Sequence, residues 1–357
     1  MTSPRPLLAV VVPARDNHDL TRACVRSVAR AARSVALEIL VVDDGSAVPV
    51  SDALADLGLE LRILRHERSV GFTKAANAGL RAADSPLLLL LNNDTELDAG
   101  ALAPLVEAFQ RDPGLGIAGG TLYYPDGAPQ WSGGREPSLL WLFALASGLP
   151  ALLGRIPGYR RWRPLHRPKA SLDWVTGAAL ALRREVWREV GPFDEGLGAY
   201  AQDLDLCLRA KRLGWAIRVL PDVRLRHHHG ATMAGATTGG AGSEHPEKLW
   251  TSLLAWSHKE GGARLLRRAR LAFGLGGRIR LALRAVGRPF VRAAEAPAYD
   301  RSTRSYRAAL RAVGSFVPPP SRIPRRLPRL APIDTVGSPE RPLVDAGRRI
   351  DVARSLR

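Results

Sequence analysis

The chain alternates short, continuous apolar runs with segments in which apolar residues recur every three or four positions. The runs are too short for isolated helices and predict strands that are buried on both faces. Four of them lie in the first hundred residues, at 7–13, 38–42, 61–64 and 87–91. The spacing between and after them predicts helices over 19–32, 72–83 and 100–110. This alternation predicts an α/β fold, with a doubly wound and mostly parallel sheet flanked by helices.

The pattern is less regular after residue 110. One helix is expected over 203–213, and the expected strands are 116–124, 174–182, 216–220 and 224–229. The apolar stretch 139–153 contains Pro150 and is too short to span a membrane, so it is either a core helix or a surface that touches lipid. No run of about 20 apolar residues occurs, and we expect no membrane span.

The last third of the chain differs in character from the rest. Residues 249–294 interleave apolar side chains with arginines, which predicts basic helices, and Gly274, Gly276 and Gly277 are expected to divide them. Beyond residue 313 the chain is rich in Pro and Arg without periodicity, and we expect disorder. Three segments follow: a sheet-containing domain at 1–245, a basic amphipathic helical extension at 246–312 and a tail at 313–357.

Polar residues follow the apolar run 87–91 abruptly, as Asn92, Asn93 and Asp94. Ligands of parallel sheets bind beyond the carboxyl ends of the strands, so these side chains are expected to project into a site. A carboxylate with amides suits a hard divalent cation that also holds phosphate oxygens. The alternative is a polar turn in which Asn and Asp bond to the local backbone.

Polar groups also follow the earlier predicted strands. Pro13 and Arg15 come after the first, and Asp43 and Asp44 after the second. An acid after the second strand of such a sheet commonly accepts hydrogen bonds from a nucleoside, although DDGS is also an ordinary turn sequence. Residues 71–79, GFTKAANAG, open a helix whose free N–H groups suit an anion, without the GK[ST] ending of a Walker loop.

These pieces occur in an order that is typical of one family. The quotable segments are VVVPARDN, EILVVDDGS, GFTKAANAGL, LLLLLNNDTELDAGAL, DWVTGAALALRREVWREVGPFDE, AYAQDLDLCLRAKRLGW and VRLRHHHGAT. Together they resemble the family 2 glycosyltransferases with the GT-A fold, among them bacterial rhamnosyltransferase-like enzymes of cell-surface polysaccharide assembly. The resemblance covers about two thirds of the chain. It implies an inverting, metal-dependent transfer of sugar from a nucleotide-sugar donor.

The resemblance assigns roles on the donor side. Asp43 matches the acid that contacts the nucleobase, and Asp94 matches the carboxylate that binds Mg²⁺ or Mn²⁺ on the sugar-nucleotide diphosphate. His227 matches a histidine that completes this metal site in some relatives, although three consecutive histidines also suit a solvated turn. The remaining residues expected in the nucleotide-sugar pocket are Pro13, Arg15, Asp44, Gly71, Asn77, Asn92 and Asn93.

The resemblance also places the acceptor side. Gln202 and Asp203 match the family's Glu-Asp pair, whose aspartate is the general base. Sugar transfer with inversion needs one carboxylate to take the acceptor proton, and a position just before a helix favours the anionic form. Gln202 departs from the usual glutamate. Gly177 lies in the segment beneath the acceptor, and Trp174 at its entry either stacks on a sugar or fills the core.

The distribution of charge along the chain indicates a binding partner besides the substrates. The net charge is +18, and residues 251–357 contain 23 Lys and Arg against 7 Asp and Glu, whereas the rest of the chain is nearly neutral. Few aromatic residues accompany the arginines, which argues against nucleic acid. The leucine and arginine interleaving is typical of a helix on an anionic membrane surface. The alternative is a basic helical pair that packs its leucines on the sheet domain and leaves its arginines in water.

Three further hypotheses concern function and location. A catalytically impaired homologue that binds nucleotide sugar is suggested by Asn92 and Gln202, whereas a nucleotidyltransferase lacks support because PARDN has no Gly-rich loop. The donor nucleotide is expected to be of UDP, dTDP or GDP type, and the acceptor a saccharide or a lipid-linked one. Cys24 and Cys207 are expected to be buried thiols in a reducing compartment. With the basic C-terminal segment, this leads us to expect a cytoplasmic protein that is peripheral on the inner face of the membrane.

Overall fold

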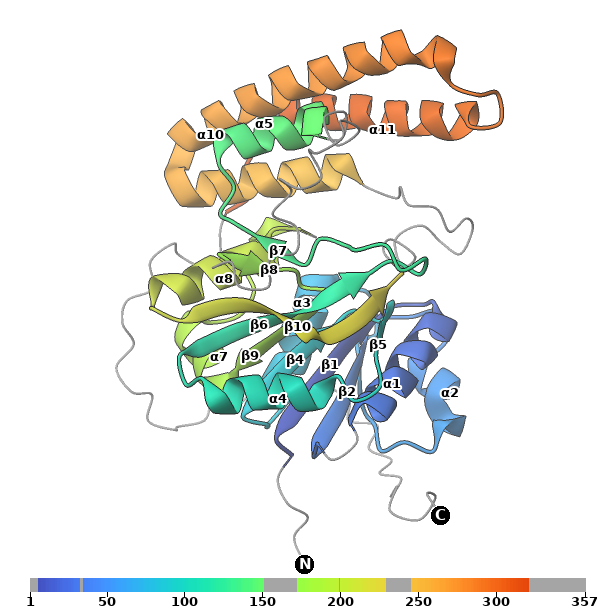
Figure 1. Ribbon diagram of the computed structural model, residues 1–357, viewed down its shortest axis with the longest axis vertical. Coiled ribbons are helices and arrows are strands. Elements are labelled where there is room, and N and C mark those ends of the chain that lie inside the picture. Colours follow the sequence, from blue (N-terminus) through green and yellow to red (C-terminus); the bar gives the residue numbers. More distant parts are fainter. Residues whose placement is uncertain (1–5, 33–34, 151–171, 199, 229–244, 321–357) are drawn as a thin grey trace, which may run out of the picture.

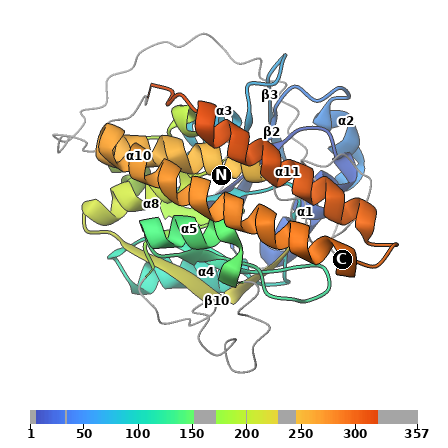
Figure 2. The same cartoon turned by 90° about the horizontal axis from the view of Figure 1, so that it is seen from above.

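A computed structural model describes residues 6–32, 35–150, 172–198, 200–228 and 245–320 of the protein. A central sheet lies between helices, and a second layer of helices is stacked at one end of this unit (Figure 1). In the view from above, α10 and α11 cross over the sheet domain side by side (Figure 2). The predicted tail falls almost wholly at 321–357, which lies outside the described residues.

The sheet has eight strands in the order β3-β2-β1-β4-β9-β6-β10-β5. Strands β1 to β4 are parallel, β9 is antiparallel to both β4 and β6, and β10 is parallel to β6. The carboxyl ends of β1 to β4, β6 and β10 therefore meet at one edge of the sheet. The strands are β1 (Leu8–Ala14), β2 (Leu37–Asp43), β3 (Arg62–Arg65), β4 (Leu87–Leu91), β5 (Thr95–Leu97), β6 (Leu115–Tyr123), β9 (Ala179–Arg183) and β10 (Ala216–His227). A second, two-stranded sheet pairs β7 (Gly133–Gly134) with β8 (Trp174–Val175).

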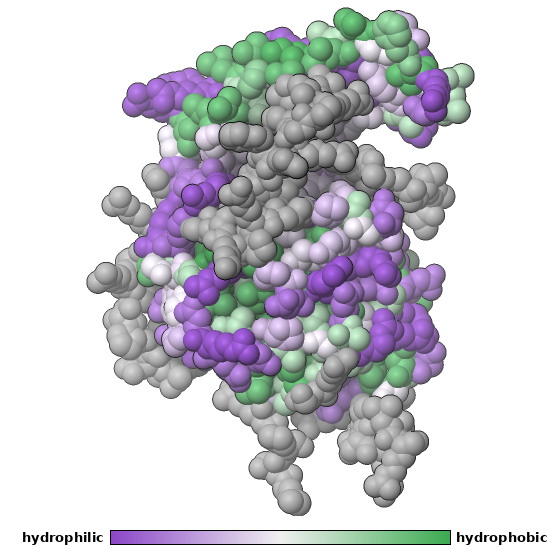
Figure 3. All heavy atoms as spheres, in the orientation of Figure 1, coloured by the Kyte–Doolittle hydropathy of each residue, from purple (hydrophilic) through white to green (hydrophobic). Residues whose placement is uncertain are grey.

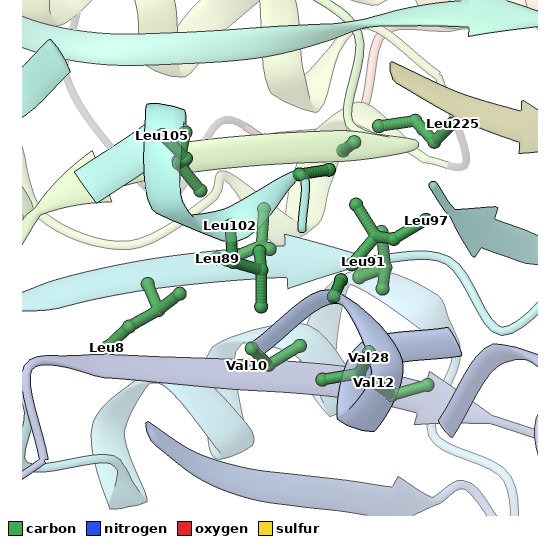
Figure 4. Close-up of a cluster of buried hydrophobic side chains, with 14 of the residues drawn as sticks. Leu8, Val10, Val12, Val28, Leu89, Leu91, Leu97, Leu102, Leu105 and Leu225 are labelled. Carbon is green, nitrogen blue, oxygen red and sulfur yellow. The ribbon is translucent and has the colours of Figure 1, made fainter. Parts of the chain in front are cut away.

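The five leucines of β4 are buried on both faces, as their continuous apolar run predicts. Leu89 and Leu91 pack with alternate residues of β1 and with α1 and α4 on one face (Figure 4). Leu88 and Leu90 pack with α3, α7 and α8 on the other. Because side chains alternate across a strand, one apolar run supplies both cores. The helices over the first face are α1 (His18–Ala32), α2 (Val50–Leu54) and α4 (Leu102–Arg111), followed on the second face by α3 (Phe72–Ala82), α7 (Arg184–Val190) and α8 (Gln202–Arg212). Short 3-10 turns occupy η1 (Ala55–Leu57), η3 (Glu195–Leu197) and η4 (Arg288–Phe290).

The helical layer has its own core. It is formed by α5 (Leu139–Ser147), α10 (Pro246–Gly287) and α11 (Ala296–Ser315), together with residues of α8. The backbone of α10 leaves helical geometry at Gly261 and Gly262, and Trp250 before this bend stacks on Phe273 after it, with 5.3 Å between ring centroids. The apolar stretch 139–153 is thus a packed helix over 139–147, and its last three residues lie outside the described part.

The prediction that Gly274, Gly276 and Gly277 divide the basic helices is wrong, because α10 is helical through all three. Their role is close packing. A Cβ on Gly276 would lie 2.7 Å from the carbonyl oxygen of Phe143 in α5, and one on Gly277 would lie 3.1 Å from both Trp250 and Leu310. The absence of a side chain lets these helices approach.

The first part of α10 is docked on the sheet domain by buried ion pairs. Nζ of Lys259 lies 2.7 Å from carboxylate oxygens of both Asp194 and Asp205, and all three side chains are at least 97% buried. Beside them, Arg209 pairs with Asp205 within α8. Glu260 pairs with Arg212 at the end of α8. The boundary at 245/246 is therefore crossed by strong contacts.

Three expected strands differ from those observed. The strand expected over 174–182 is split into β8 and β9 by a turn at 176–178, and the strands expected at 216–220 and 224–229 are one strand, β10, with a register shift between Leu220 and Arg224. Across the described residues, no helix is both long and apolar enough to cross a membrane. Both cysteines are buried free thiols, as expected.

Candidate functional site

The loops that follow β1, β2 and β3 are tied together at the carboxyl edge of the sheet. Asp43, at the end of β2, is fully buried and accepts hydrogen bonds from the N–H groups of Ser46 (2.9 Å) and Val50 (3.1 Å). The Arg65 guanidinium at the end of β3 bonds to the same carboxylate. Burial opposes ionisation of Asp43, but these hydrogen bonds and the Arg65 charge outweigh it and lower its pKa.

Asp44 fixes the next loop. Its carboxylate accepts hydrogen bonds from Val70 N–H (2.7 Å), Gly71 N–H (3.0 Å) and Ser69 Oγ (2.8 Å). Between the two acids, Gly45 has φ +70°, and a Cβ there would lie 2.5 Å from the Ser69 nitrogen. The DDGS turn thus requires glycine for both its backbone conformation and this close approach.

The other expected donor-side residues differ in accessibility. Arg15 is exposed and donates to Ser69 Oγ at 3.1 Å, whereas Pro13 is buried within β1. Asn77 is fully buried, and its amide joins α3 to Phe193 and to the Glu195 carboxylate. In this structure Asn77 supports the chain before η3 and does not reach the surface.

Asp94 and His227 meet where β4 and β10 end. Their side chains are 5% and 8% exposed, and Nε2 of His227 lies 3.3 Å from Oδ1 of Asp94. The following histidine faces elsewhere, because His228 Nε2 lies 2.9 Å from the Glu96 carboxylate. His229 lies outside the described residues. The HHH sequence therefore places one histidine beside Asp94.

The two asparagines before Asp94 lie differently. Asn93 is buried and donates to Thr21 Oγ1 in α1 at 3.0 Å, so its amide points toward the helix that covers this face. Asn92 is partly exposed, and its Oδ1 is buried without a hydrogen-bond partner in the described structure. Its backbone N–H donates to Ala178 O at 3.0 Å, which joins the end of β4 to the turn at 176–178.

Asp203 lies in the first turn of α8. Its Oδ2 accepts a 2.7 Å hydrogen bond from Gly177 N–H, and its Oδ1 accepts from Leu204 N–H at 2.8 Å. Burial raises the pKa of this carboxyl above its ordinary value, and the backbone hydrogen bonds only partly offset this effect. A raised pKa makes the carboxylate a better proton acceptor than an ordinary aspartate.

The residues just before Asp203 are strained and buried. Ala201 has φ +69°, a left-handed conformation that a residue with a Cβ adopts at a cost, and such strain concentrates at functional sites. Gln202 is 6% exposed, and its Oε1 is buried without a hydrogen-bond partner among the described residues. An uncompensated buried amide oxygen is costly, so this group is poised to accept a hydrogen bond from a ligand.

Three tryptophans gather beside the turn at 176–178. The Trp131 ring lies 5.0 Å from Trp174 in an edge-on arrangement and 5.5 Å from Trp141 of α5. Trp174 donates its indole N–H to Arg135 O at 3.0 Å, and Trp131 is 40% exposed. Trp174 is thus held within the cluster, and Trp131 is more exposed than Trp174.

The side chains around Asp94 can be compared with the ligands that a divalent cation needs. Within the described ranges no group of three or more His, Cys, Asp and Glu side chains is placed to hold a metal. Asp94 and His227 supply one oxygen and one nitrogen ligand in a buried position. This set fits Mg²⁺ or Mn²⁺ whose remaining ligands are water and diphosphate oxygens, as is usual for cations that accompany nucleotides.

Three residues of this site were missed by the sequence analysis. Arg65 neutralises Asp43, Gln130 contacts His227, and Trp131 extends the aromatic cluster. Arg65 directly follows the strand predicted at 61–64, and this position after a strand is a usable signal. Gln130 and Trp131 lie in the irregular region 125–170, where no periodicity marks their positions.

Comparisons with known proteins agree with this geometry. The family model described as glycosyl transferase family 2 matches residues 9–185. The O-antigen biosynthesis protein RfbC of Myxococcus xanthus is 30% identical over 64% of this chain and 18% of its own length. N-acetylglucosaminyl-diphospho-decaprenol L-rhamnosyltransferase of Mycobacterium tuberculosis is 29% identical over 54% of this chain and 66% of its own length. The chain therefore spans from about a fifth to two thirds of these relatives.

A solved structure has the same architecture. The mannosyltransferase PcManGT from Pyrobaculum calidifontis, in complex with GDP-Man and Mn²⁺, superposes with a TM-score of 0.54 at 17% identity. The similarity covers 87% of this chain and 88% of that protein, so it includes part of the helical layer. The predicted GT-A fold with a helical C-terminal extension is thereby confirmed.

Proposed function

Because this chain belongs to glycosyl transferase family 2, we propose that it transfers a sugar from a nucleotide-sugar donor to an acceptor hydroxyl, with inversion at the anomeric carbon. The proposed acceptor is a saccharide or lipid-linked saccharide of cell-surface polysaccharide or glycolipid biosynthesis. One observation carries the proposal. The turn at 176–178 bonds to Asp203 through Gly177 and to Asn92 through Ala178, so the base and the end of β4 share one support.

The donor is proposed to lie across the carboxyl edge of the sheet. The loops fixed by Asp43 and Asp44 receive the nucleoside, with Arg15 exposed beside them, and Gly71 at the start of α3 adjoins this pocket. Asp94 and His227 would hold Mg²⁺ or Mn²⁺, which neutralises charge on the departing diphosphate. The neighbour solved with GDP-Man supports testing a GDP-type donor, and donors of UDP and dTDP type are tested beside it.

The reaction needs one proton transfer and one displacement. Asp203 takes the proton of the acceptor hydroxyl, and the oxygen attacks the anomeric carbon from the side opposite the diphosphate. The bond from this carbon to the diphosphate oxygen breaks as the new glycosidic bond forms, and the nucleoside diphosphate leaves with the bonding electrons. Trp174, shortly before the turn that bonds to Asp203, and Trp131 beside it are proposed to offer an aromatic surface to an acceptor sugar.

The presence of Gln202 where the family has glutamate does not by itself favour a function other than sugar transfer. A neutral amide stands in place of the family glutamate, and the raised pKa of Asp203 supports its proposed role as the base. A nucleotide-sugar-binding homologue without activity would keep the donor pocket and lack transfer. A nucleotidyltransferase would form nucleotide sugar from sugar phosphate and nucleoside triphosphate.

One assay separates these three. The purified protein with Mn²⁺ is incubated with UDP-, dTDP- and GDP-sugars, and release of nucleoside diphosphate is followed with and without saccharide acceptors. Release that an acceptor accelerates, with a β-type product from an α-linked donor, is the expected result. Donor binding without release would support the inactive homologue, and pyrophosphate release in a parallel incubation with sugar phosphate and nucleoside triphosphate would support the nucleotidyltransferase.

We further propose that the helical layer holds the protein on an anionic membrane surface on the cytoplasmic face. Figure 3 shows hydrophobic residues gathered on the outer part of this layer. On α10 and η4 the exposed ones, named here the outer stripe, are Leu271, Leu275, Leu283, Val286 and Phe290. Exposed arginines accompany them at 264, 267, 268 and 278. Apolar side chains beside arginines suit an anionic lipid interface.

Not every arginine of this segment is available for headgroups. Arg280 donates to the carbonyl oxygens of Ala146 and Leu145, and Arg284 donates to Thr303 and Tyr299. Arg270 bonds to the Phe316 carbonyl. These three groups satisfy backbone groups inside the layer. The lipid-facing charge is therefore assigned to the exposed arginines alone.

A further inference from the structure

Gln130 is a buried amide that holds His227 at two points. Its Nε2 donates to the His227 carbonyl oxygen at 2.6 Å and lies 3.4 Å from the Tyr123 carbonyl oxygen. Its Oε1 lies 2.9 Å from Nδ1 of the His227 ring. Gln130 is 5% exposed and comes from the irregular chain that follows β6. It belongs to neither strand whose end forms the metal-binding pair.

The orientation of this amide is fixed by chemistry. A carbonyl oxygen accepts hydrogen bonds and cannot donate them, so the amide end that faces the carbonyls of His227 and Tyr123 must be the NH₂ group. The flipped amide would place its oxygen against both carbonyl oxygens. Oε1 of Gln130 therefore faces the histidine ring. This oxygen is an acceptor, so Nδ1 of His227 must carry a hydrogen.

The position of that hydrogen decides what the other ring nitrogen does. In a neutral imidazole with hydrogen on Nδ1, Nε2 presents a lone pair. This lone pair is aimed at Oδ1 of Asp94, 3.3 Å away. Two acceptors at this separation in a buried place repel each other unless a positive group lies between or beside them. The pair is thus arranged for a cation that both atoms can bind.

We propose that Gln130 is a positioning residue that keeps His227 in the Nδ1–H form, with Nε2 ready to bind the divalent cation. The inference rests on the metal site of the proposed function. Partners of this kind, which bond to the far nitrogen of a metal-binding histidine, fix its ring and raise its ligand strength, and their loss typically weakens metal binding 10- to 100-fold. The bond from Nε2 of Gln130 to the His227 backbone adds control over where β10 ends.

The same segment reaches the other half of the site. Ser132, two residues after Gln130, accepts a hydrogen bond from Thr176 N–H at 3.1 Å, and Gly133 and Gly134 pair with β8. The turn that supports Asp203 is thus attached to the chain that orients His227. Gln130 therefore fixes the cation ligand relative to the base and not merely within its own strand.

The first test determines which ring nitrogen of His227 carries the hydrogen. Long-range ¹H–¹⁵N correlation spectra of the metal-free protein distinguish the two neutral tautomers from the doubly protonated ring and assign the state of each histidine. His227 is expected to carry its hydrogen on Nδ1 in the wild type, and Gln130→Met is expected to lose this preference. A hydrogen on Nε2 of His227 in the wild type would overturn the proposal, whether or not the variant folds.

The second test measures the affinity of the site for Mn²⁺. Free Mn²⁺ is titrated into metal-free protein and followed by electron paramagnetic resonance, first alone and then with pyrophosphate. Gln130→Met is expected to bind Mn²⁺ about 10- to 100-fold more weakly. His228→Gln is the matched control, because His228 faces Glu96, and it is expected to bind as the wild type does.

Two results would distinguish a failure of the positioning role of Gln130 from a failure of the proposed metal site. Equal Mn²⁺ affinity of the wild type and Gln130→Met would refute the positioning role. A wild type that has Nδ1–H on His227 yet binds no Mn²⁺ would refute the proposed metal site, while it would support the orienting effect of Gln130 on the ring. The failure of the inference is therefore distinguishable from the failure of the function on which it rests.

Discussion

The backbone N–H of Gly177 donates a 2.7 Å hydrogen bond to Oδ2 of Asp203, across the gap between the turn that precedes β9 and the first turn of α8. Leu204 N–H holds the other oxygen. Both donors are backbone groups, so the carboxylate is fixed by the fold and not by a mobile side chain. Burial meanwhile raises its pKa. A group that is both held and made more basic is suited to take a proton in a defined direction.

Asp203→Asn tests this role. Asparagine has nearly the same shape but accepts no proton, so we expect sugar transfer to fall by about 10²-fold or more. Donor affinity should change little, because the donor is assigned to the loops after β1, β2 and β4. The measurement is kcat/KM for transfer beside a nucleotide binding titration. Near-normal turnover would contradict the assignment, and Gln202→Glu is the companion variant, which should keep activity.

The pH dependence of the wild type gives an independent check. Asp203 must be ionised to act as the base, and its pKa is raised above the ordinary range by burial. Transfer should therefore be full at neutral pH and be lost as the pH falls through this raised pKa. We expect the acidic limb of kcat/KM to lie above the value of an ordinary aspartate, about 3.9. A limb at or below that value would mean that another group limits the reaction.

The sequence predicts the sheet domain well because its signals are local. The run Leu87–Leu91 identifies a doubly buried strand, and the polar residues after it mark the edge at which Asp94 lies. Asp94 follows β4 and His227 ends β10, and strands β9 and β6 lie between these two in the sheet. The contact of Asp94 with His227 therefore depends on the order and direction of the strands, which no local sequence pattern determines. Gln130 and Trp131 lie in irregular chain, and the glycines of α10 gain their meaning from α5, which is distant in sequence.

The two proposed metal ligands should contribute unequally to Mn²⁺-dependent binding of nucleoside diphosphate. Asp94→Ala removes the carboxylate, and we expect it to abolish Mn²⁺-dependent binding of nucleoside diphosphate, since the remaining imidazole is a weak site by itself. His227→Ala should weaken this binding less. Calorimetric titration with and without chelator measures both effects, and circular dichroism checks that β4 and β10 remain folded. Equal affinity of the wild type in chelator and in Mn²⁺ would indicate a site that needs no metal.

Lys259 allows a test of how firmly the helical layer is attached to the sheet domain. Its ammonium group lies between the buried carboxylates of Asp194 and Asp205. Lys259→Met leaves excess negative charge in a buried place, and breaking a buried pair in this way costs about 3–5 kcal/mol. Chemical unfolding measures the loss. Lys248→Met is the matched control, because Lys248 is exposed on the same helix, and its free energy of unfolding should hardly change. A small loss for both would mean that α10 is docked mainly by its apolar contacts.

The membrane proposal is tested on the outer stripe. Leu271 and Leu275 are 73% and 57% exposed on α10, and burying such a side chain fully is worth about 1.5–3 kcal/mol. Arg267 and Arg268 lie exposed nearby, and each basic residue near an anionic surface adds about 1 kcal/mol. We therefore expect the full chain to co-sediment with phosphatidylglycerol vesicles at low salt and to be released as salt is raised.

The variants separate the apolar from the ionic contribution. Leu271→Ser with Leu275→Ser should weaken vesicle binding at every salt concentration, whereas Arg267→Gln with Arg268→Gln should weaken it mainly at low salt, since screening removes the ionic part at high salt. Val48→Ser is the control, because Val48 is an equally exposed apolar residue on the sheet domain, at 55%. Recovery of the wild type in the supernatant with both anionic and neutral vesicles at low salt would refute the proposal. The outer stripe would then remain a surface of the helical layer without a lipid partner.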